Sequence, residues 1–248
     1  MQKYFVKNEQ IDVTLNKAFI IGSDVHHIKN VMRMKESSKI IISNNIDSYF
    51  CEIESIEDSI VKCNIIEKQT NNNELSINIS IAHGLTTREK REEVIDKITQ
   101  LGALKYIPIQ LKKCLVKLSE NSGKQIERLN KIAKEASEQS MRTKMLEVME
   151  PIKLKELITM GKSYDLCLVA STVASSDVDN LTKYIVSKKY KNILILIGSE
   201  AGIDKTEEDE LIKNGWIPFS LGKRILRTEV APVYIMSVIS YLDEFRKE

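Results

Sequence analysis

The chain has 248 residues, of which 42% are hydrophobic and 29% are charged, as is typical of soluble globular proteins. This length is enough for one large domain or two modest ones. The longest uninterrupted aliphatic run, Ile193–Ile197, is too short to cross a membrane, and the N-terminus lacks the apolar stretch of a signal peptide. We therefore expect a cytoplasmic protein that makes no use of a membrane.

The net charge of +2 is unevenly distributed. Residues 86–145 contain fourteen Lys and Arg against eight Asp and Glu, a net charge of +6. The other segments, residues 1–72, 73–85 and 146–248, have net charges of −1, −1 and −2. A basic segment of this kind can bind the phosphates of a nucleic acid, but a solvated helix face has the same composition. Charge alone leaves both interpretations open.

Four widely spaced cysteines fit no metal-binding or redox motif: Cys51, Cys63, Cys114 and Cys167. Because each has apolar neighbours, we expect free buried thiols in a reducing compartment. The chain has only three histidines, so a histidine-rich metal site is not expected either.

The first 70 residues favour a small β domain. Short β-branched runs separated by turn residues predict five strands, at Lys3–Val6, Ala18–Ile21, Lys39–Ser43, Tyr49–Glu54 and Ile60–Ile66. Between them, apolar residues recur at helical spacing over Asp24–Met34. The polar stretch Lys68–Glu74 has no periodicity and is typical of a linker. We therefore predict a first domain over residues 1–72, a compact β-barrel with one short helix.

From Leu75 onward, strands and helices alternate. The predicted strands are Leu75–His83, Ala103–Gln110, Tyr164–Ala170, Asn192–Gly198 and Trp216–Leu221. The predicted helices are Thr87–Leu101, Ser122–Ser140, Asp177–Lys188, a short one from Thr206 to Asn214, and Thr228–Phe245. Because continuous apolar strands that alternate with helices are typical of parallel sheets, residues 73–248 predict an α/β domain.

Three loops follow the strands of this second domain: Ser171–Ala174, Gly198–Gly202 and Gly222–Glu229. In open α/β sheets, ligands bind at the carboxyl ends of the strands, where such loops lie. The glycines of the second loop match neither a dinucleotide-binding fingerprint nor a P-loop. The third loop carries three cations, and we expect Thr228 to cap the last helix and Glu229 to lie in its first turn. These features favour an α/β enzyme that binds a nucleotide-like cofactor.

The sequence GSEAGID, followed by LGKRILRTEVAP, resembles the paired loops of the RsmE-type 16S rRNA uridine-N3 methyltransferases of the SPOUT superfamily. Other segments resemble that family in the same order, at Met1–Val6, Val25–Met34, Ile107–Cys114 and Glu135–Arg142. The resemblance implies a PUA-like RNA-binding β-barrel followed by a SPOUT methyltransferase domain with a trefoil knot. It also implies S-adenosylmethionine as cofactor, a homodimer, and 16S rRNA of the small ribosomal subunit as substrate.

The resemblance further implies roles for individual residues. Arg227 and Glu229 fall at the family's most characteristic positions, where Arg227 would stabilise the charge developing on uridine and Glu229 would accept the N3 proton or orient Arg227. The expected cofactor-binding residues are Val169, Ala170, Gly198, Glu200, Gly202, Leu221, Gly222, Ile225 and Leu226. The expected RNA-binding residues are Lys3, Arg33, Lys35, Lys112, Lys113 and Arg142.

The sequence departs from the family pattern in the loop that usually reads Gly-Pro-Glu-Gly-Gly. Here Ser199 replaces the proline and Ala201 replaces a glycine. If that glycine needs a left-handed conformation, alanine would be strained and cofactor affinity would fall. The altered loop leaves open the alternative of an RNA-binding protein that no longer holds the cofactor. A SPOUT enzyme that methylates a ribose 2′-hydroxyl is a second alternative, although the LGKRILRTE loop argues against it.

Overall fold

The structure is a computed structural model that describes residues 1–70, 73–117, 123–171, 184–185 and 189–245. The chain forms two compact units. The first comprises Met1–Glu74 together with Ser137–Met145, and the second comprises Leu75–Ala136 and Leu146–Glu248. The sequence pattern assigns Ser137–Met145 to the second domain, whereas the structure packs this segment into the first unit. A helical period identifies a buried face but cannot show which unit that face contacts.

The first unit is built on a six-stranded sheet with the order β1-β4-β5-β6-β3-β2. Its strands are β1 (Gln2–Phe5), β2 (Ile11–Asp12), β3 (Lys17–Ile21), β4 (Lys39–Ser43), β5 (Ser48–Ile56) and β6 (Ile60–Lys68). Only β1 and β4 pair in parallel, and all other neighbours are antiparallel. In this order the two end strands, β1 and β2, are not neighbours, so the six strands form a curled sheet, which agrees in part with the compact β-barrel expected.

A short helical segment covers this sheet. It consists of α1 (Ser23–His26) and a π-helical turn, η2 (His27–Val31), while a single 3-10 turn, η1 (Asn8–Gln10), lies earlier in the chain. Val25 and Ile28 are buried, as their spacing predicts, but Val31 and Met32 are exposed. The helix stops early because Arg33 adopts a left-handed conformation, with φ at 51°.

A buried ion pair joins Ser137–Met145 to the rest of the first unit. The side chains of Arg142 and Glu74 are 2% and 6% exposed, and Arg142 Nη2 donates to Glu74 Oε2 over 2.6 Å. Glu74 also accepts hydrogen bonds from the backbone N–H groups of Thr143 and Lys144. Because both charges are paired and the carboxylate accepts further hydrogen bonds, their burial is tolerated.

The second unit is built on a parallel sheet with the order β10-β8-β7-β12-β11-β13, with β9 paired to β8. Its strands are β7 (Asn78–Gly84), β8 (Lys105–Gln110), β9 (Glu147–Val148), β10 (Ile152–Lys153), β11 (Leu166–Ala170), β12 (Asn192–Ile197) and β13 (Ile217–Phe219). The helices described are α2 (Arg88–Gln100), α3 (Gly123–Gln139), α4 (Leu154–Gly161), α6 (Lys205–Lys213) and α7 (Val230–Phe245). All strand pairs are parallel, as the apolar runs predict.

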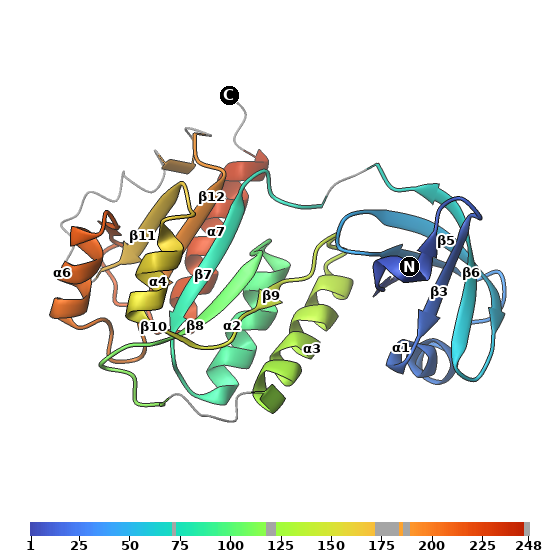
Figure 1. Ribbon diagram of the computed structural model, residues 1–248, viewed down its shortest axis with the longest axis horizontal. Helices are drawn as coiled ribbons and strands as arrows, with labels where there is room; N and C mark the ends of the chain where they lie inside the picture. The colour runs from blue at the N-terminus through green and yellow to red at the C-terminus, as the bar shows by residue number, and fades with distance from the viewer. Residues whose placement is uncertain (71–72, 118–122, 172–183, 186–188, 246–248) are drawn as a thin grey trace. The chain divides into compact units, whose positions relative to one another are not determined.

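Helices cover both faces of this sheet (Figure 1). On one face, α2, α3 and α7 pack on Ile79, Ile81, Ile193 and Ile195. On the other, α4 and α6 contribute Leu157 and Leu211 to a second cluster with Leu194 and Leu196. Alternate residues of β12 therefore point into two different cores, which explains why this strand is apolar throughout.

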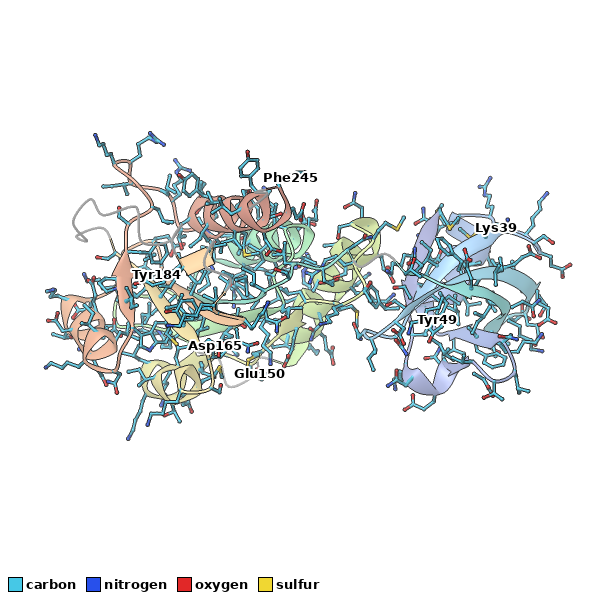
Figure 2. All side chains as sticks on the ribbon, turned by 90° about the horizontal axis from the view of Figure 1, so that it is seen from above. Lys39, Tyr49, Glu150, Asp165, Tyr184 and Phe245 are labelled. Atoms are coloured by element: carbon cyan, nitrogen blue, oxygen red, sulfur yellow. The ribbon has the colours of Figure 1, made fainter. Side chains whose placement is uncertain are left out.

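The amino ends of the central strands are fixed by Asp165, which Figure 2 labels. Its Oδ2 accepts hydrogen bonds from the backbone N–H groups of Lys191 and Asn192, over 2.9 and 2.7 Å. The hydrogen bond from Asn192, followed by the one from Lys191, lowers the pKa of Asp165 below its usual value. The start of β12 is thereby held beside the start of β11, which sets the register in which both strands reach the opposite edge.

The predicted helix Asp177–Lys188 lies almost wholly outside the described residues. All four cysteines are free, three of them buried and Cys167 partly buried. Among the described residues, none of the helices is both long and apolar enough to span a membrane.

Candidate active site

Three loops meet at the carboxyl edge of the parallel sheet. They follow β7, β12 and β13, and they comprise residues 85–87, 198–204 and 220–229. The approach between the first two is close at Gly84, where an added Cβ would lie 2.4 Å from the backbone nitrogen of Ser199. Only glycine fits at that position. The sheet order therefore brings together segments that are more than 100 residues apart in sequence.

The loop after β12 folds back on itself. Ser199 and Gly202 form an isolated β-bridge, in which Gly202 N–H donates to the Ser199 carbonyl over 2.8 Å. A Cβ on Gly198 would lie 2.8 Å from the carbonyl carbon of Gly202, so the turn needs glycine there. Gly202 has a φ of +75°, whereas Ala201 is not left-handed. The strain expected at Ala201 is therefore absent, because the left-handed position of this loop has kept its glycine.

Thr228 connects this loop to the one after β13. Its hydroxyl donates to the Gly198 carbonyl over 2.8 Å and therefore accepts from His83 Nε2, which lies 2.7 Å away. His83 Nδ1 is then the acceptor for the Tyr106 hydroxyl at 3.0 Å. The sequence predicts Thr228 as a helix cap, but the side chain turns inward and α7 begins two residues later, at Val230.

This arrangement fixes His83 as the neutral tautomer that carries its proton on Nε2. The side chain is fully buried, and burial is the main cause that lowers its pKa to about 4. Burial likewise raises the pKa of the Tyr106 hydroxyl, so this group keeps its proton and can donate it. The polar chain from Tyr106 through His83 and Thr228 to Gly198 is therefore uncharged and fully paired at neutral pH.

Lys90 forms ion pairs with two carboxylates, those of Glu200 and Glu229. Lys90 Nζ, in the first turn of α2, donates to Glu200 Oε1 over 3.0 Å and lies 3.6 Å from Glu229 Oε2. Glu200 also accepts a hydrogen bond from the Thr86 hydroxyl. Burial works to raise the pKa of Glu200, but the hydrogen bonds from Thr86, its own backbone N–H and Lys90 hold that pKa below the usual value. Glu200 is thus an ionised anchor between the two loops.

Glu229 is placed differently. Its side chain is 12% exposed, and its Oε2 is buried without a hydrogen-bond partner among the described residues. Arg227 Nη1 lies 3.9 Å from Glu229 Oε1, while the rest of the Arg227 side chain extends into solvent and is 85% exposed. The pair therefore offers one carboxylate oxygen that can still accept a hydrogen bond, and one guanidinium that is free to reach a ligand.

The expected cofactor-binding residues surround the same three loops. Val169 is fully buried at the end of β11, and Ala170, Leu221 and Leu226 are partly buried against the core. Gly222 has a φ of +106°. No atom lies within 4 Å of where a Cβ would be at Gly222 or at Gly202. Ile225, by contrast, is 89% exposed. Open backbone beside aliphatic side chains fits an adenosine group.

Comparison with known proteins identifies the family. An RNA methyltransferase domain model matches residues 73–240, and an RNA methyltransferase PUA domain model matches residues 20–66. The chain is 39% identical to ribosomal RNA small subunit methyltransferase E of Bacillus subtilis, with 98% of each protein covered. The chain belongs to the ribosomal RNA small subunit methyltransferase E family. A family member from Mesomycoplasma hyopneumoniae is 27% identical, covering 96% of this chain and 98% of that protein.

Solved structures have the same fold. One described as a hypothetical protein is 38% identical, with a TM-score of 0.89 over 98% of this chain and 99% of that one. A ribosomal RNA small subunit methyltransferase E from Neisseria gonorrhoeae, bound to S-adenosylmethionine, has a TM-score of 0.86 at 22% identity over 98% of both chains. At 22% identity, the similarity to the Neisseria gonorrhoeae protein is evidence for the fold only.

The RNA-binding residues expected from the resemblance to methyltransferase E proteins divide into two groups. Arg33, Lys35, Lys112 and Lys113 are exposed. Lys3 and Arg142 are each 2% exposed, so the expectation that they contact RNA at the surface is corrected. Lys3 Nζ donates to Ser48 Oγ over 2.9 Å and to the Met141 carbonyl, and burial lowers the pKa of Lys3 to about 8. Both cations instead stabilise the first unit.

Sequence reasoning missed three residues of the site: His83, Thr86 and Lys90. Their only signal is position, because His83 lies near the end of β7, Thr86 in the loop after it, and Lys90 in the first turn of α2. Since β7 lies beside β12 in the sheet, its carboxyl end meets the Gly198–Gly202 loop directly. The order of strands in a sheet cannot be read from a single sequence.

Proposed function

We propose that the chain transfers a methyl group from S-adenosylmethionine to N3 of a uridine in 16S rRNA of the small ribosomal subunit. The support comes from membership of the ribosomal RNA small subunit methyltransferase E family and from a family member that binds S-adenosylmethionine. The observation that carries the proposal in this chain is Glu229, whose buried Oε2 lacks a hydrogen-bond partner among the described residues at the meeting point of the loops.

The cofactor supplies a methyl group on a positively charged sulfur. In the proposal, the backbone of Gly198–Gly202 and of Leu221–Gly222 binds its adenosine part, with Val169, Ala170 and Leu226 around the ring. The glycines permit this close approach, since no side chain occupies the space beside Gly202 and Gly222. Glu200 would anchor the loop through Thr86 and Lys90.

The chemistry at uridine needs a base and a cation. Methyl transfer forms the N3–carbon bond and breaks the sulfur–carbon bond, while the N3 proton leaves. We assign Glu229 Oε2 as the acceptor of that proton, since this oxygen lies within the site and accepts no hydrogen bond there, with Lys90 Nζ 3.6 Å away. Arg227, which is 85% exposed and so free to move, would stabilise the negative charge that spreads onto the flanking carbonyl oxygens. Positioning of the two reactants supplies much of the remaining acceleration.

An arginine variant tests the role of the cation. Arg227→Ala should lower turnover while leaving the affinity for S-adenosylmethionine unchanged, because the guanidinium is assigned to the uridine and not to the cofactor. Turnover rates and calorimetric affinities of the variant and the parent protein check this. Full turnover at unchanged cofactor affinity would remove Arg227 from the mechanism and leave Glu229 acting without it.

The finer structural features of the family belong to the same proposal: a trefoil knot in the second unit, a homodimer, and a cytoplasmic location. An observation that supports the dimer is a row of exposed apolar residues on and just before α7, which includes Tyr234, Tyr241 and Phe245. Exposed apolar side chains in such a row are typical of a subunit interface. Sedimentation equilibrium of the purified protein tests the dimer.

Nucleoside analysis tests the function directly. Small subunits that lack the modification are incubated with the protein and methyl-labelled S-adenosylmethionine, and their RNA is then digested to nucleosides. The proposal expects label in 3-methyluridine. Label in a 2′-O-methylated nucleoside would favour the ribose-methylating alternative. Binding of RNA without binding of S-adenosylmethionine would favour the alternative of an RNA-binding protein that lacks the cofactor.

A further inference from the structure

A second basic site lies between α2 and α3. The two helices enclose an open groove with a volume of about 200 Å³. Four cations line it, Arg88 and Arg91 from α2 and Lys124 and Arg128 from α3, together with Glu92, Gln125 and Leu129. None of these residues belongs to the site described above. The groove is smaller than the pocket of a drug-sized ligand, roughly 300–1,000 Å³, so it has room for one small group of a larger molecule.

The charges of this groove are only partly balanced. Glu92 accepts hydrogen bonds from Arg88 Nε over 2.7 Å and from both Nε and Nη2 of Arg128. These contacts, with Arg128 the stronger partner, lower the pKa of Glu92 to about 2, so it is fully ionised. The single carboxylate of Glu92 is thus ion-paired with both Arg88 and Arg128. Within the described part of the chain, Arg91 and Lys124 have no carboxylate within ion-pairing distance, which leaves the groove with a net charge of +3.

Arg91 is the residue that indicates a ligand. It is only 8% exposed, and its Nη2 donates to Gln125 Oε1 over a long 3.4 Å. Its Nε is buried and has no hydrogen-bond partner among the described residues. A buried charged donor without a partner is costly, because its lost hydration is not replaced. An anion in the groove would offset that cost.

The backbone adds positive potential at the same place. Arg88 begins α2, and Lys124 lies in the first turn of α3, so residues from the N-terminal ends of both helices line the groove. Helix N-termini favour anions, and phosphate groups are common there. Guanidinium groups match the geometry of phosphate oxygens and can bind them in pairs. The chemistry of the groove therefore suits a phosphate better than a carboxylate or an uncharged ligand.

The groove and the candidate active site both use residues from the start of α2, Arg88 for the groove and Lys90 for the site. Arg91 follows Lys90, which holds Glu200 and lies 3.6 Å from Glu229. All of these residues lie in the second unit.

We propose that this groove binds a phosphodiester group of the RNA strand that carries the target uridine. The proposal rests on the proposed function, since it takes the substrate to be RNA. Arg91 and Lys124 bind the phosphate oxygens. Glu92 acts as a positioning residue, because it holds Arg88 and Arg128 at the two sides of the groove.

The test measures RNA affinity against salt concentration. Two variants remove the cations without a carboxylate partner, Arg91→Gln and Lys124→Gln. The control is Lys131→Gln, which removes the same charge from α3 at an exposed position outside the groove. Because Lys124 is exposed, its variant is expected to fold even if Arg91→Gln does not. Calorimetry with S-adenosylmethionine, in which each variant should match the parent protein, checks that the fold is intact.

Loss of one phosphate contact lowers the slope of log affinity against log salt by about 0.7–0.9. We expect this change for Lys124→Gln and Arg91→Gln, and no change for Lys131→Gln. Equal slopes for all variants, in a protein that still forms 3-methyluridine, would overturn the groove proposal and leave the proposed function intact. Reduced slopes in a protein that forms no methylated nucleoside would retain the groove and remove the function. Inorganic phosphate that binds to the groove without competing with RNA would also overturn the proposal, since the site would then take a free anion.

Discussion

The hydroxyl of Thr228 links three segments that are far apart in sequence. It joins the Gly198 carbonyl at the end of β12 to His83 in β7, and through His83 to Tyr106 in β8. The backbone of the flanking residues, Arg227 and Glu229, is thereby held beside the loop after β12, while the Arg227 side chain stays exposed. Thr228 is thus a positioning residue for this segment, a role that its place before a helix does not reveal.

Replacing this hydroxyl should weaken the site. In Thr228→Val, the Gly198 carbonyl and His83 Nε2–H each lose a buried partner, at a cost of about 1–3 kcal/mol each. We expect lower affinity for S-adenosylmethionine and a lower free energy of unfolding, measured by calorimetry and denaturation. Thr228→Ser keeps the hydroxyl and serves as the control. Equal affinities for the valine and serine variants would show that the hydrogen bonds do not shape the cofactor loop.

His83 should make stability sensitive to acid. Its pKa is lowered from 6.5 to about 4 in the folded protein, so between those values the unfolded chain binds a proton that the folded chain does not. The free energy of unfolding should therefore fall as pH decreases from 6.5 to 4, with a contribution from this group of up to about 1.4 kcal/mol per pH unit. Denaturation of His83→Gln across this range should show a shallower slope than the parent protein. Identical slopes would mean that His83 is not buried as a neutral group.

At the scale of elements, the segment Ser137–Met145 shows how a chain can return to an earlier unit. The last residues of α3 and the turn after them pack into the first unit through the Arg142–Glu74 pair. The sequence analysis of charge counts Arg142 as one more cation of a basic segment. Its partner lies 68 residues away, so neither spacing nor composition indicates that the charge is buried.

Removing one member of this pair should destabilise the first unit. Arg142→Met leaves Glu74 buried without its cation, and breaking such a pair costs about 3–5 kcal/mol. Hydrogen exchange of peptides from β5 and β6 should show the loss. The matched control is Lys131→Met, which breaks an exposed pair with Glu135 that contributes about 1 kcal/mol or less. Unchanged protection in Arg142→Met would mean that the segment is not needed to hold the unit together.

The sequence predicts long helices and strands better than short ones. Long or strongly patterned ones such as β4, β12 and α2 lie within a residue or two of their predicted positions. The two-residue strands β2, β9 and β10 are missed, since a period of two cannot be recognised in two residues. The eight-residue α4 is missed as well, because two turns give too little periodicity to stand out.

At the scale of the whole molecule, the sequence predicts where the two proposed cofactor loops lie but not the contacts between them. The Gly198–Gly202 and Gly222–Glu229 loops follow apolar strands, and parallel sheets place such loops at one edge. The partners from β7 and α2 depend on strand order, which brings Gly84 against Ser199. Similarly, the basic segment 86–145 supplies a buried structural cation in Arg142 and a concentrated groove between α2 and α3. Its net charge predicts neither.

The central claim is that Glu229 takes the N3 proton during methyl transfer to uridine. Single-turnover transfer from labelled S-adenosylmethionine to small subunits tests it most directly, with the parent protein compared to Glu229→Gln at saturating cofactor. We expect 3-methyluridine from the parent protein and a rate at least about 100-fold lower for the variant, in line with loss of a general base, with cofactor and RNA affinities unchanged. An equal rate in the variant, or label on ribose in the parent protein, would contradict the account.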